Sequence, residues 1–526
     1  MSAPSPVVSD THEEGSPKNL LRSSVVTSGS TLLSRILGLA RETVFAALFG
    51  DGAAADAFFI AFRIPNLLRR LFAEGAFSQA FVPVLAEYRA KGDHAQIHDF
   101  VRHVSGALGT ALLLITVLGV ILAPWLSGLF APGFIGNTAK FELLVAMLQV
   151  TFPYILLISL TGFAGAILNS YGNFAVPALT PVILNVVLIV AALAVSPLFS
   201  EPTMALAWGV LIAGFLQFGV QLPFLRGLRL MPWPRLDWKH SGVNRVLGLM
   251  VPVLFSVSVG QINLLLDSVL ATSIQGDGNV SWLYYSDRLM ELPLGMFAVG
   301  IATVILPALS RIHNAKEVTQ FSDTLQWGLR CVLVLGIPAS AAFLVLADPL
   351  IVTLFQYGAF GVDAVAPTRR SLQAYSIGLV GFMAIKVLAS GYFSRQDTRT
   401  PVRYGVVSMV SNMALNLLFI LPLAHVGLAL ATSLSALLNA GLLLRGLVQR
   451  QVLNWRAGWV AFLLKLTLAT VAMVVVLLLI DPGLETWLVW RASMRVLWLL
   501  LICGGGALVY GGVLLACGVR LRDFRG

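Results

Sequence analysis

The sequence predicts an all-α polytopic membrane protein with about 14 transmembrane helices, arranged as two parallel six-helix repeats plus two C-terminal helices. The first observation is composition: of 526 residues, 57% are hydrophobic and 11% are charged, and the mean hydropathy is +0.85. The second is a succession of apolar stretches of about 20 residues or more, the length that a helix needs to cross a bilayer. The third is a residue pattern that recurs in the second half of the chain. A chain of this composition is suited to lipid rather than to water.

The predicted helices follow the polar residues 1–23, which are rich in Pro and Ser and are expected to form a disordered cytoplasmic tail. Lys and Arg gather in alternate connections between the helices, and the set that includes both chain ends holds most of them. The positive-inside rule therefore places both termini in the cytoplasm and requires an even number of helices. The expected spans are 24–49, 55–88, 98–127, 140–170, 175–196, 203–226, 243–274, 279–311, 324–356, 366–394, 400–421, 426–449, 457–480 and 493–518.

A turn and its surroundings recur between the two halves of the chain. The Gly-Asp-Gly turn at 50–52 precedes an aromatic patch and Arg63, and the same turn at 276–278 precedes an aromatic patch and Arg288. Six predicted helices separate the copies, so both have the same orientation, and parallel repeats of this kind place a substrate site between them. The expected divisions are an N-terminal lobe over 24–226, a C-terminal lobe over 227–450, and a final pair of helices with a cytoplasmic end over 451–526.

Charged side chains interrupt the first, second and eighth predicted helices. Each charge at the centre of a membrane helix costs about 2.5–3.5 kcal/mol, so we expect these residues to face a wet cavity and to act there. Cations exceed anions among them, and the arginine fork binds phosphate or carboxylate through two hydrogen bonds. The sequence therefore predicts an arginine-lined cavity for an anionic substrate. The candidate substrate-binding residues are Arg35, Arg41, Asp56, Arg69, Arg70, Glu74, Arg288 and Glu291.

Some of these charges have a second interpretation. Arg288 and Glu291 are spaced i, i+3, and Arg70 and Glu74 are spaced i, i+4, so each pair could form an ion pair that only locks helices together. The excess of positive charge around Pro65 favours the cavity over this alternative for the group as a whole.

A second polar set lies in the predicted C-terminal lobe. Asp267 is a lone carboxylate in the span 243–274, Asn412 and Asn416 share one face of the next-to-last lobe helix, and Thr432 lies on the last. Together they could donate oxygens to a sodium ion or hold a proton, which would couple transport to an ion gradient. The alternative is ordinary hydrogen bonding between membrane helices. Membrane potential acting on the cavity arginines is the competing source of energy.

Other chemistries lack their motifs in this sequence. Cys331, Cys503 and Cys517 are far apart, so neither a disulfide framework nor a metal cluster is indicated. The histidines lie in the tail, in loops or at helix ends, without a nucleophile or base arrangement, and no nucleotide-binding loop is present. The net charge of +10 resides in the loops, as topology requires, and does not indicate nucleic acid. We therefore expect no enzyme, no cofactor and no metal besides sodium.

Several blocks of sequence resemble a known family. They include SRILGLARETVFAALFG at 34–50, DAFFIAFRIPNLLRRLFAEGAFSQAFVPVLAEY at 56–88, SWLYYSDRLMELPLG at 281–295 and YFSRQDTRTPV at 392–402. With them the chain resembles the MurJ (MviN) lipid II flippases of Gram-negative bacteria, in the multidrug/oligosaccharidyl-lipid/polysaccharide (MOP) exporter superfamily. The resemblance implies two six-helix lobes, two further helices that form a groove for the lipid tail, and movement of the undecaprenyl-pyrophosphate-linked disaccharide-pentapeptide from the inner to the outer leaflet of the inner membrane.

The resemblance also implies roles for particular residues. Arg35, Arg41, Asp56, Arg69, Arg288 and Glu291 stand at positions of function-critical charges in the family. Some members bind sodium through the helices that here carry Asp267, Asn412, Asn416 and Thr432, although Asn416 stands where a carboxylate is expected. The implied partners are lipid II, the membrane and cell-wall synthesis proteins, without nucleic acid, and the expected state is a monomer. Two alternatives remain: another MOP exporter, such as a drug/cation antiporter or a polysaccharide-lipid flippase, and a non-transporting cell-wall scaffold.

Overall fold

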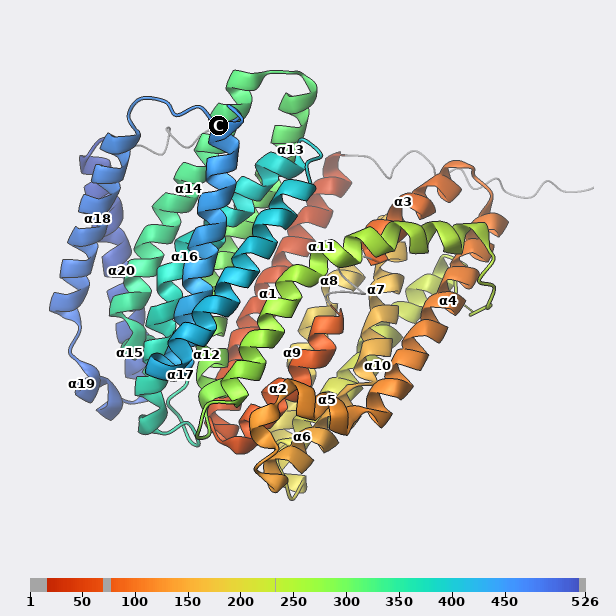
Figure 1. Cartoon of the computed structure of the whole chain (residues 1–526), viewed down its shortest axis with the longest axis horizontal. Coiled ribbons are helices and arrows are strands. Elements are labelled where there is room, and N and C mark those ends of the chain that lie inside the picture. The colour runs from red at the N-terminus through yellow and green to blue at the C-terminus, as the bar shows by residue number, and fades with distance from the viewer. Residues whose placement is uncertain (1–16, 70–76, 232, 520–526) are drawn as a thin grey trace, which may run out of the picture. The chain divides into compact units, whose positions relative to one another are not determined.

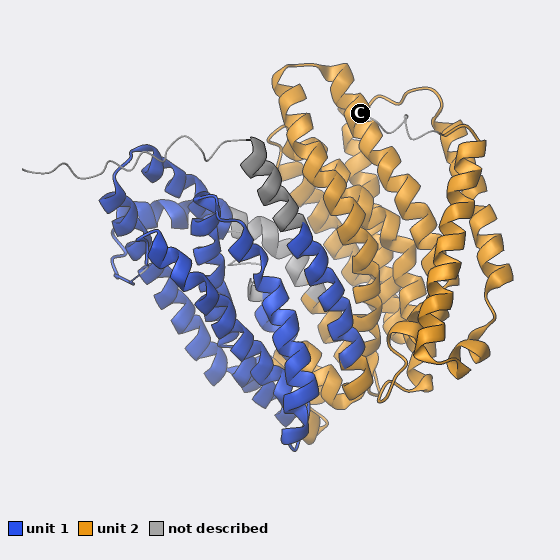
Figure 2. Cartoon of the chain, turned by 180° about the vertical axis from the view of Figure 1, so that it is seen from behind, with its two compact units in different colours: residues 1–44, 61–126, 142–258 blue, residues 45–60, 127–141, 259–526 orange. Residues whose placement is uncertain are grey.

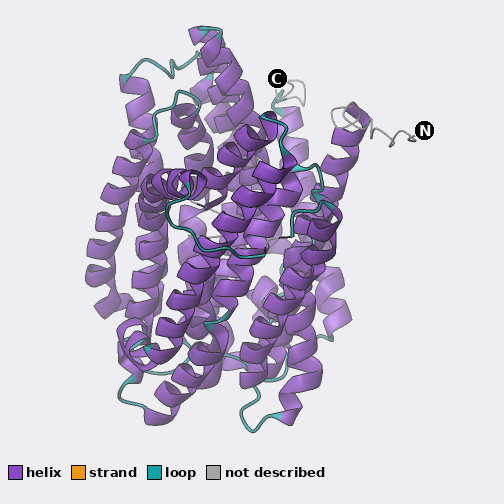
Figure 3. Cartoon of the chain, turned by 90° about the vertical axis from the view of Figure 1, so that its right-hand side faces the viewer, coloured by secondary structure: helices purple, strands orange, loops and turns teal. Residues whose placement is uncertain are grey.

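The computed structural model describes residues 17–69, 77–231 and 233–519 (Figure 1). All regular elements of these residues are helices, joined by short loops, and no strand occurs among them (Figure 3). The helices are α1 (Pro17–Phe49), α2 (Ala53–Arg69), α3 (Phe77–Ala90), α4 (His94–Ile121), α5 (Ala123–Phe130), α6 (Thr138–Thr151), α7 (Tyr154–Ser170), α8 (Ala175–Ala178), α9 (Thr180–Val190), α10 (Met204–Gly227), α11 (Ser241–Thr272), α12 (Asn279–Pro293), α13 (Val299–Asn314), α14 (Val318–Val345), α15 (Ala347–Leu354), α16 (Val365–Phe393), α17 (Arg399–Gln449), α18 (Trp459–Ile480), α19 (Leu484–Val489) and α20 (Ala492–Ala516).

Ten helical stretches of the described residues are long and apolar enough to cross a membrane. They coincide with the predicted spans except the first, second and seventh, and the predicted spans 400–421 and 426–449 both lie in α17. The first and seventh spans correspond to α1 and α11, which are long helices of 33 and 32 residues. The all-helical membrane fold is thus confirmed, whereas the number 14 remains a prediction.

Several of the predicted spans are divided at or next to a proline. Pro153 separates α6 from α7, and Pro293 precedes a π-helical turn that joins α12 to α13. Within α17, Ala424 has a non-helical backbone (φ 49°, ψ −132°) two residues after Pro422, which is the break expected between residues 421 and 426. Proline lacks the backbone donor and clashes with the preceding turn, so these positions are where continuous helix is least stable. In contrast, α2 continues past Pro65 to Arg69.

The chain divides into two compact units (Figure 2). Unit 1 comprises residues 1–44, 61–126 and 142–258, and unit 2 comprises residues 45–60, 127–141 and 259–526. The chain passes between them inside α1, α2, α5, α6 and α11. The predicted lobes over 24–226 and 227–450 remain a prediction from the repeat. Of the predicted tail, residues 1–16 lie outside the described part, and α1 already begins at Pro17, a residue suited to a first helical turn.

Stacked aromatic rings form the centre of unit 1. Phe81 of α3 stacks on Phe100 of α4 with ring centroids 5.6 Å apart, and the same Phe100 stacks on Tyr88 at 4.5 Å. Phe163 of α7 meets the edge of Phe81 at 5.1 Å. These buried rings join α3, α4 and α7 into one core, which fixes the start of α4.

Close helix packing and two glycine turns organise unit 2. A Cβ on Gly378 of α16 would lie 2.5 Å from the Cα of Ser433 on α17, so the two backbones meet where a side chain is absent. The recurring turns lie against α12 in this unit: Tyr285 donates to the Gly50 carbonyl at 3.0 Å, and the Trp282 indole N–H donates to Asp51 at 2.6 Å. The first glycine of each turn, Gly50 and Gly276, has positive φ (63° and 90°), which explains why glycine recurs there.

Candidate functional site

Arg41 of α1 lies in a buried polar cluster of unit 1. Its Nη1 donates to Oδ1 of Asn185 on α9 at 3.0 Å, and its Nη2 forms an ion pair with Glu42. The exposed fractions of Arg41, Glu42 and Asn185 are 8%, 2% and 6%. Asn185 in turn donates to the carbonyl of Ser34 at 2.9 Å, so α9 holds α1 through one amide side chain. Asn185 and Glu42 thus fix the orientation of the Arg41 guanidinium, and Glu42 neutralises part of its charge.

Asn185 also packs closely against α1. Gly38 lies between Ser34 and Arg41, and a Cβ there would lie 3.7 Å from the Asn185 amide nitrogen, which is an ordinary van der Waals distance. The sequence prediction found Arg41 but not Asn185, whose only signal was a single amide within the apolar stretch TPVILNVVLIV.

The remaining predicted charges of α1 and α2 are less fully described. Arg35 is half-buried on α1 and belongs to unit 1. Arg69 is the last residue of α2, but its side chain lies outside the described part. Arg70 and Glu74 lie outside the described residues altogether, so their predicted roles and their pairing remain predictions.

Asp56 of α2 lies in a buried ionic cluster of unit 2. Its exposed fraction is 1%, and its Oδ2 accepts from the Lys140 ammonium at 3.2 Å and from the Gly278 N–H at 3.0 Å. Its Oδ1 accepts from both the N–H and the hydroxyl of Ser281, at 2.9 and 2.6 Å. Asp277 of the second glycine turn also binds Lys140, at 2.8 Å.

The donors to Asp56 are those of a helix start. Gly278 is the N-cap residue of α12 and Ser281 lies in its first turn, so Asp56 satisfies backbone N–H groups that have no partner within the helix. Gly278 itself has φ 92°, and a Cβ there would lie 2.7 Å from the Trp282 ring. A carboxylate at this place also complements the positive end of the helix dipole. Asp56 thus joins α2, Lys140 and α12, and sequence inspection missed Lys140 as its partner because the two are distant in the chain.

Arg288 and Glu291 on α12 of unit 2 form the i, i+3 ion pair that their spacing allows, with the charged atoms 2.6 Å apart. Their side chains are 25% and 39% exposed, so the pair is accessible rather than buried. The guanidinium lies 4.8 Å from the centre of the Tyr284 ring, which stacks on Phe59 with centroids 3.9 Å apart. An arginine held by a ring and by a carboxylate keeps a defined place.

The four residues of the predicted cation site lie together in unit 2. Oδ1 of Asp267 on α11 accepts from the amides of Asn412 and Asn416 at 3.1 and 2.7 Å, and its Oδ2 accepts from the Thr432 hydroxyl at 3.1 Å. The Asn412 amide also donates to Asn263 at 2.8 Å. Asp267, Asn412 and Asn416 are 9%, 1% and 0% exposed. The structure therefore brings together on α11 and α17 what the sequence placed on three separate helices.

These contacts are the hydrogen bonds between membrane helices that were the alternative to a cation site. The same side chains also carry oxygen atoms that could bind a cation. The Oδ1 atoms of Asn412 and Asn416 are buried and accept no hydrogen bond from the described residues. If both amides turned over, these oxygens would face Asp267, and a hard cation between them would have carboxylate, amide and hydroxyl ligands.

A cavity of about 640 Å³ lies within unit 1 and was not predicted from the sequence. It is lined by α7, α9 and α10, and Gln217 and Gln221 reach it from successive turns of α10. Gln217 accepts from the Tyr154 hydroxyl at 3.2 Å and donates to the Thr180 carbonyl at 2.7 Å. The Oε1 of Gln221 is buried and accepts no hydrogen bond from the described residues. The cavity wall is therefore uncharged and mostly apolar, with a few polar side chains that include the two glutamines.

The sequence matches the model of a family described as lipid II flippase MurJ over residues 45–497. A protein of Vibrio cholerae serotype O1 named probable lipid II flippase MurJ is 49% identical over 515 residues, which cover 97% of this chain and 98% of that protein. A protein of Burkholderia cenocepacia named lipid II flippase MurJ is 43% identical over 452 residues, which cover 85% of this chain and 87% of that protein.

Solved structures give a matching result. A structure titled lipid II flippase MurJ, inward closed conformation, superimposes with a TM-score of 0.79 at 28% identity and covers 93% of this chain and 98% of that one. An inward-facing multidrug resistance transporter of the MATE family, in the MOP superfamily, gives 0.66 at 13% identity and covers 81% of this chain and 98% of that one. At this lower identity the likeness concerns the fold alone.

Proposed function

Because the chain belongs to the MurJ family of lipid II flippases, which are multi-pass membrane transporters and not enzymes, we propose that it moves lipid II from the inner to the outer leaflet of the bacterial inner membrane. The observation that carries this proposal is the similarity to named flippases along nearly the whole chain. The substrate would be the undecaprenyl-pyrophosphate-linked disaccharide-pentapeptide, with helices α18 and α20 serving its lipid tail.

The head group of this substrate is an anion, and the arginines suit it. We propose that Arg35, Arg41, Arg69 and Arg288 contact its pyrophosphate and carboxylates in an arginine-lined cavity, with Arg70, Glu74 and Glu291 around them. The accessible Arg288 and the hydrogen-bonded Arg41 support this, because named partners hold each guanidinium in place. Pre-positioned arginines bind phosphate without a large loss of side-chain freedom.

We propose that transport proceeds by alternating access. A sodium ion or a proton at Asp267, Asn412, Asn416 and Thr432 would return the empty carrier, and the four converging polar side chains support that coupling. Membrane potential acting on the arginines is the competing driver, worth about 2.3 kcal/mol per charge per 100 mV.

Location and partners follow from the same proposal. Both termini would lie in the cytoplasm, because the positively charged connections include both chain ends. We expect a monomer, since one chain carries both repeats, with cell-wall synthesis proteins as partners and without nucleic acid.

The test is growth of cells depleted of their own flippase, together with lipid II flipping in proteoliposomes, for variants at Arg41. Arg41→Ala should abolish flipping, and Arg41→Lys should impair it, because lysine keeps the charge but lacks the fork that reaches Asn185 and a phosphate together. Arg245→Ala is the matched control: this arginine is exposed and pairs with Glu87 at 2.6 Å in the same unit.

The outcomes separate the alternatives. Normal flipping by Arg41→Ala at normal membrane levels would remove Arg41 from the transport path. Normal growth without any flipping by the wild-type chain would indicate the scaffold. Transport of a cationic drug instead of lipid II would indicate the antiporter.

A further inference from the structure

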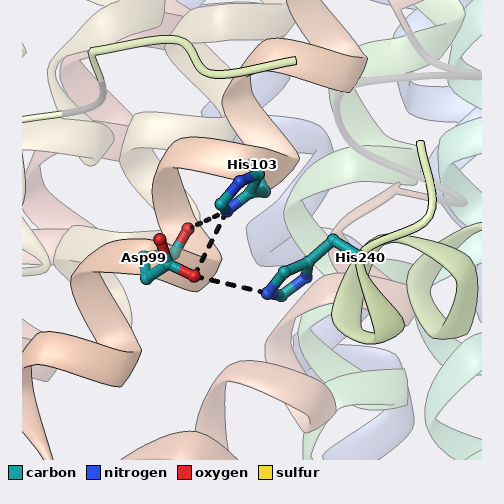
Figure 4. A group of neighbouring side chains, drawn as sticks. All are labelled: Asp99, His103 and His240. Atoms are coloured by element: carbon teal, nitrogen blue, oxygen red, sulfur yellow. Dashed lines mark hydrogen bonds and ion pairs between the residues drawn. The ribbon is translucent and has the colours of Figure 1, made fainter. Parts of the chain in front are cut away.

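Two histidines and an aspartate lie together at the start of α4 in unit 1 (Figure 4). Asp99 and His103 are one turn apart on α4, and His240 immediately precedes α11. His103 is buried, whereas Asp99 and His240 are partly exposed. The sequence predicts no metal besides sodium, because His240 is distant in the chain from Asp99 and His103 and lies in an irregular connection.

The three side chains face one another at short range. Oδ2 of Asp99 lies 3.3 Å from Nδ1 of His103 and 3.5 Å from Nε2 of His240. One ligand atom of each residue lies within 4.8 Å of the other two. Neighbouring ligands of a tetrahedral zinc ion, with bonds of about 2.0–2.1 Å, lie about 3.3 Å apart. Two edges of this ligand triangle therefore already have the length that a bound ion needs.

The third edge joins the two histidines. Their rings are stacked, with centroids 4.5 Å apart and planes at 7°. A bound ion would draw their facing nitrogens together, chiefly by turning His240, which is the more exposed of the two side chains (18% against 6%). Nδ1 of His240 accepts a 3.2 Å hydrogen bond from the Gly242 N–H. Coordination through Nε2 would replace that bond, since a neutral metal-bound histidine carries its proton on the other nitrogen.

Contacts that do not involve these side chains hold the two segments together. The Arg235 N–H donates to the Arg102 carbonyl at 3.1 Å, and a Cβ on Gly106 would lie 2.2 Å from the Arg235 carbonyl oxygen. A Cβ on Gly242 would lie 2.5 Å from the ring of Phe100, a member of the aromatic core of unit 1. The connection before α11 thus rests directly on α4 and holds the three side chains near one another. Nδ1 of His103 also donates to the Asp99 backbone carbonyl at 2.8 Å, and a bound ion would replace this hydrogen bond.

We propose that Asp99, His103 and His240 bind a divalent transition-metal ion of the Zn²⁺ class and thereby tie the start of α11 to α4. Two imidazoles and one carboxylate are a known zinc donor set, which leaves a fourth position for water. Imidazole ligands select against Mg²⁺ and Ca²⁺, which take oxygen. Because α11 belongs to both units, the ion would fix the first turn of a helix that both units share.

The test is binding of Zn²⁺ alone to the purified full chain in detergent, without a polyhistidine tag, by isothermal titration calorimetry. We expect one ion per chain, at least tenfold weaker binding for His240→Ala and for Asp99→Asn, and no comparable binding of Mg²⁺. These two residues are partly exposed, so their variants should fold; thermal unfolding in a chelator checks this. Added Zn²⁺ should raise the melting temperature of the wild type but not of His240→Ala.

His94 and His98 provide the matched control, because they are also one turn apart on α4 and could chelate an ion by themselves. The double variant His94→Ala/His98→Ala should bind Zn²⁺ like the wild type. Binding that is lost in this variant but kept in His240→Ala would overturn the proposal, and so would a wild-type chain that binds no Zn²⁺ at submillimolar concentration. In either case the three side chains would only join α4 to the start of α11 through hydrogen bonds.

Discussion

Asp56 and Asp267 are both buried carboxylates of unit 2, yet different donors surround them. Asp56 accepts from the Lys140 ammonium and from backbone N–H groups at the start of α12. Asp267 accepts from two side-chain amides and one hydroxyl. An ammonium and a backbone N–H can only donate, whereas an amide or a hydroxyl can present either a hydrogen or an oxygen. Besides the Ser281 hydroxyl, the donors named for Asp56 can only donate, whereas each donor named for Asp267 also carries an oxygen.

This difference suggests different roles for the two acids. A buried charge with a cation and a helix start as partners serves to join elements, and its removal leaves the partners uncompensated. A buried carboxylate surrounded by amide and hydroxyl groups can bind or release a small cation when these groups rotate, without movement of the helices. The sequence predicts a substrate contact for Asp56 and a cation contact for Asp267, and both assignments stay predictions.

The largest effect should come from breaking the Asp56 cluster. Asp56→Ala leaves the buried Lys140 without its buried carboxylate, beside the exposed Asp277 and the Phe134 ring, and removes the acceptor of the first turn of α12. Loss of one partner of a buried ion pair costs about 3–5 kcal/mol, so we expect a clear fall in melting temperature and in the amount of folded protein. Size-exclusion profiles and thermal unfolding in detergent measure both.

A second variant tests whether Asp56 has a structural role or contacts the substrate. In Asp56→Asn/Lys140→Met both charges are removed, which should recover much of the stability that Asp56→Asn alone loses. If lipid II flipping returns with stability, Asp56 acts by joining α2 to α12. Flipping that stays absent in a stable double variant would instead support the predicted substrate contact.

A smaller effect is expected at Asp267, and it should depend on sodium. We expect Na⁺ to raise the melting temperature of the wild type at constant ionic strength, because a ligand that binds the folded state stabilises it. Asp267→Asn keeps the shape of the side chain but removes its charge, and it should abolish this rise while changing the sodium-free stability little. Asp348→Asn is the control, since that carboxylate is held by Arg369 at 2.9 Å in the same unit. A sodium response that survives Asp267→Asn would contradict a cation site there.

Asn416→Asp should sharpen the same contrast. It places a second carboxylate beside Asp267, where the amide of Asn416 now donates at 2.7 Å. Without a cation the two charges repel, so stability in sodium-free buffer should fall; with sodium, the apparent affinity should rise about tenfold, or about 1.4 kcal/mol. The dependence of melting temperature on sodium concentration measures both changes. Equal loss of stability at every sodium concentration would argue for helix packing alone.

Much of the fold could be predicted because lipid imposes simple rules on sequence. Long apolar stretches must be helices, and the break after Pro422 separates two predicted spans, whereas Pro153 divides the stretch 140–170 that the sequence predicts as one helix. Asp267, Asn412, Asn416 and Thr432 could be grouped for a related reason, since polar side chains in apolar helices must find partners there. Whether they hold sodium does not follow from this grouping.

The contacts that could not be predicted from the sequence join residues that are far apart in the chain. Lys140 lies near a predicted helix end and Asn185 is one amide in an apolar stretch, so neither is distinguishable from ordinary loop or packing residues until the chain is folded. Asp99 and His240 meet only because glycines let an irregular connection rest on α4. Periodicity describes single helices, whereas these contacts depend on which helices adjoin.

Asp397, which lies between α16 and α17, provides the smallest effect and extends the comparison to a carboxylate near water. Partial burial alone would raise the pKa of this acid, but hydrogen bonds from Thr400 and Arg450 outweigh it and hold the pKa below the ordinary value of 3.8. A lowered pKa in the folded state means that the charge stabilises the protein above about pH 4, and that this contribution disappears as the pH falls through the folded value.

Asp397→Asn keeps the acceptor for the Thr400 N–H but loses the charge, so its melting temperature should be slightly lower than that of the wild type at pH 7. For an exposed ion pair the difference should stay below about 1 kcal/mol, and it should shrink as the pH falls below the ordinary pKa of 3.8. Thermal unfolding of both proteins from pH 3 to 7 measures it, and a difference that does not depend on pH would show that the hydrogen-bond geometry, rather than the charge, is what α17 needs at its start.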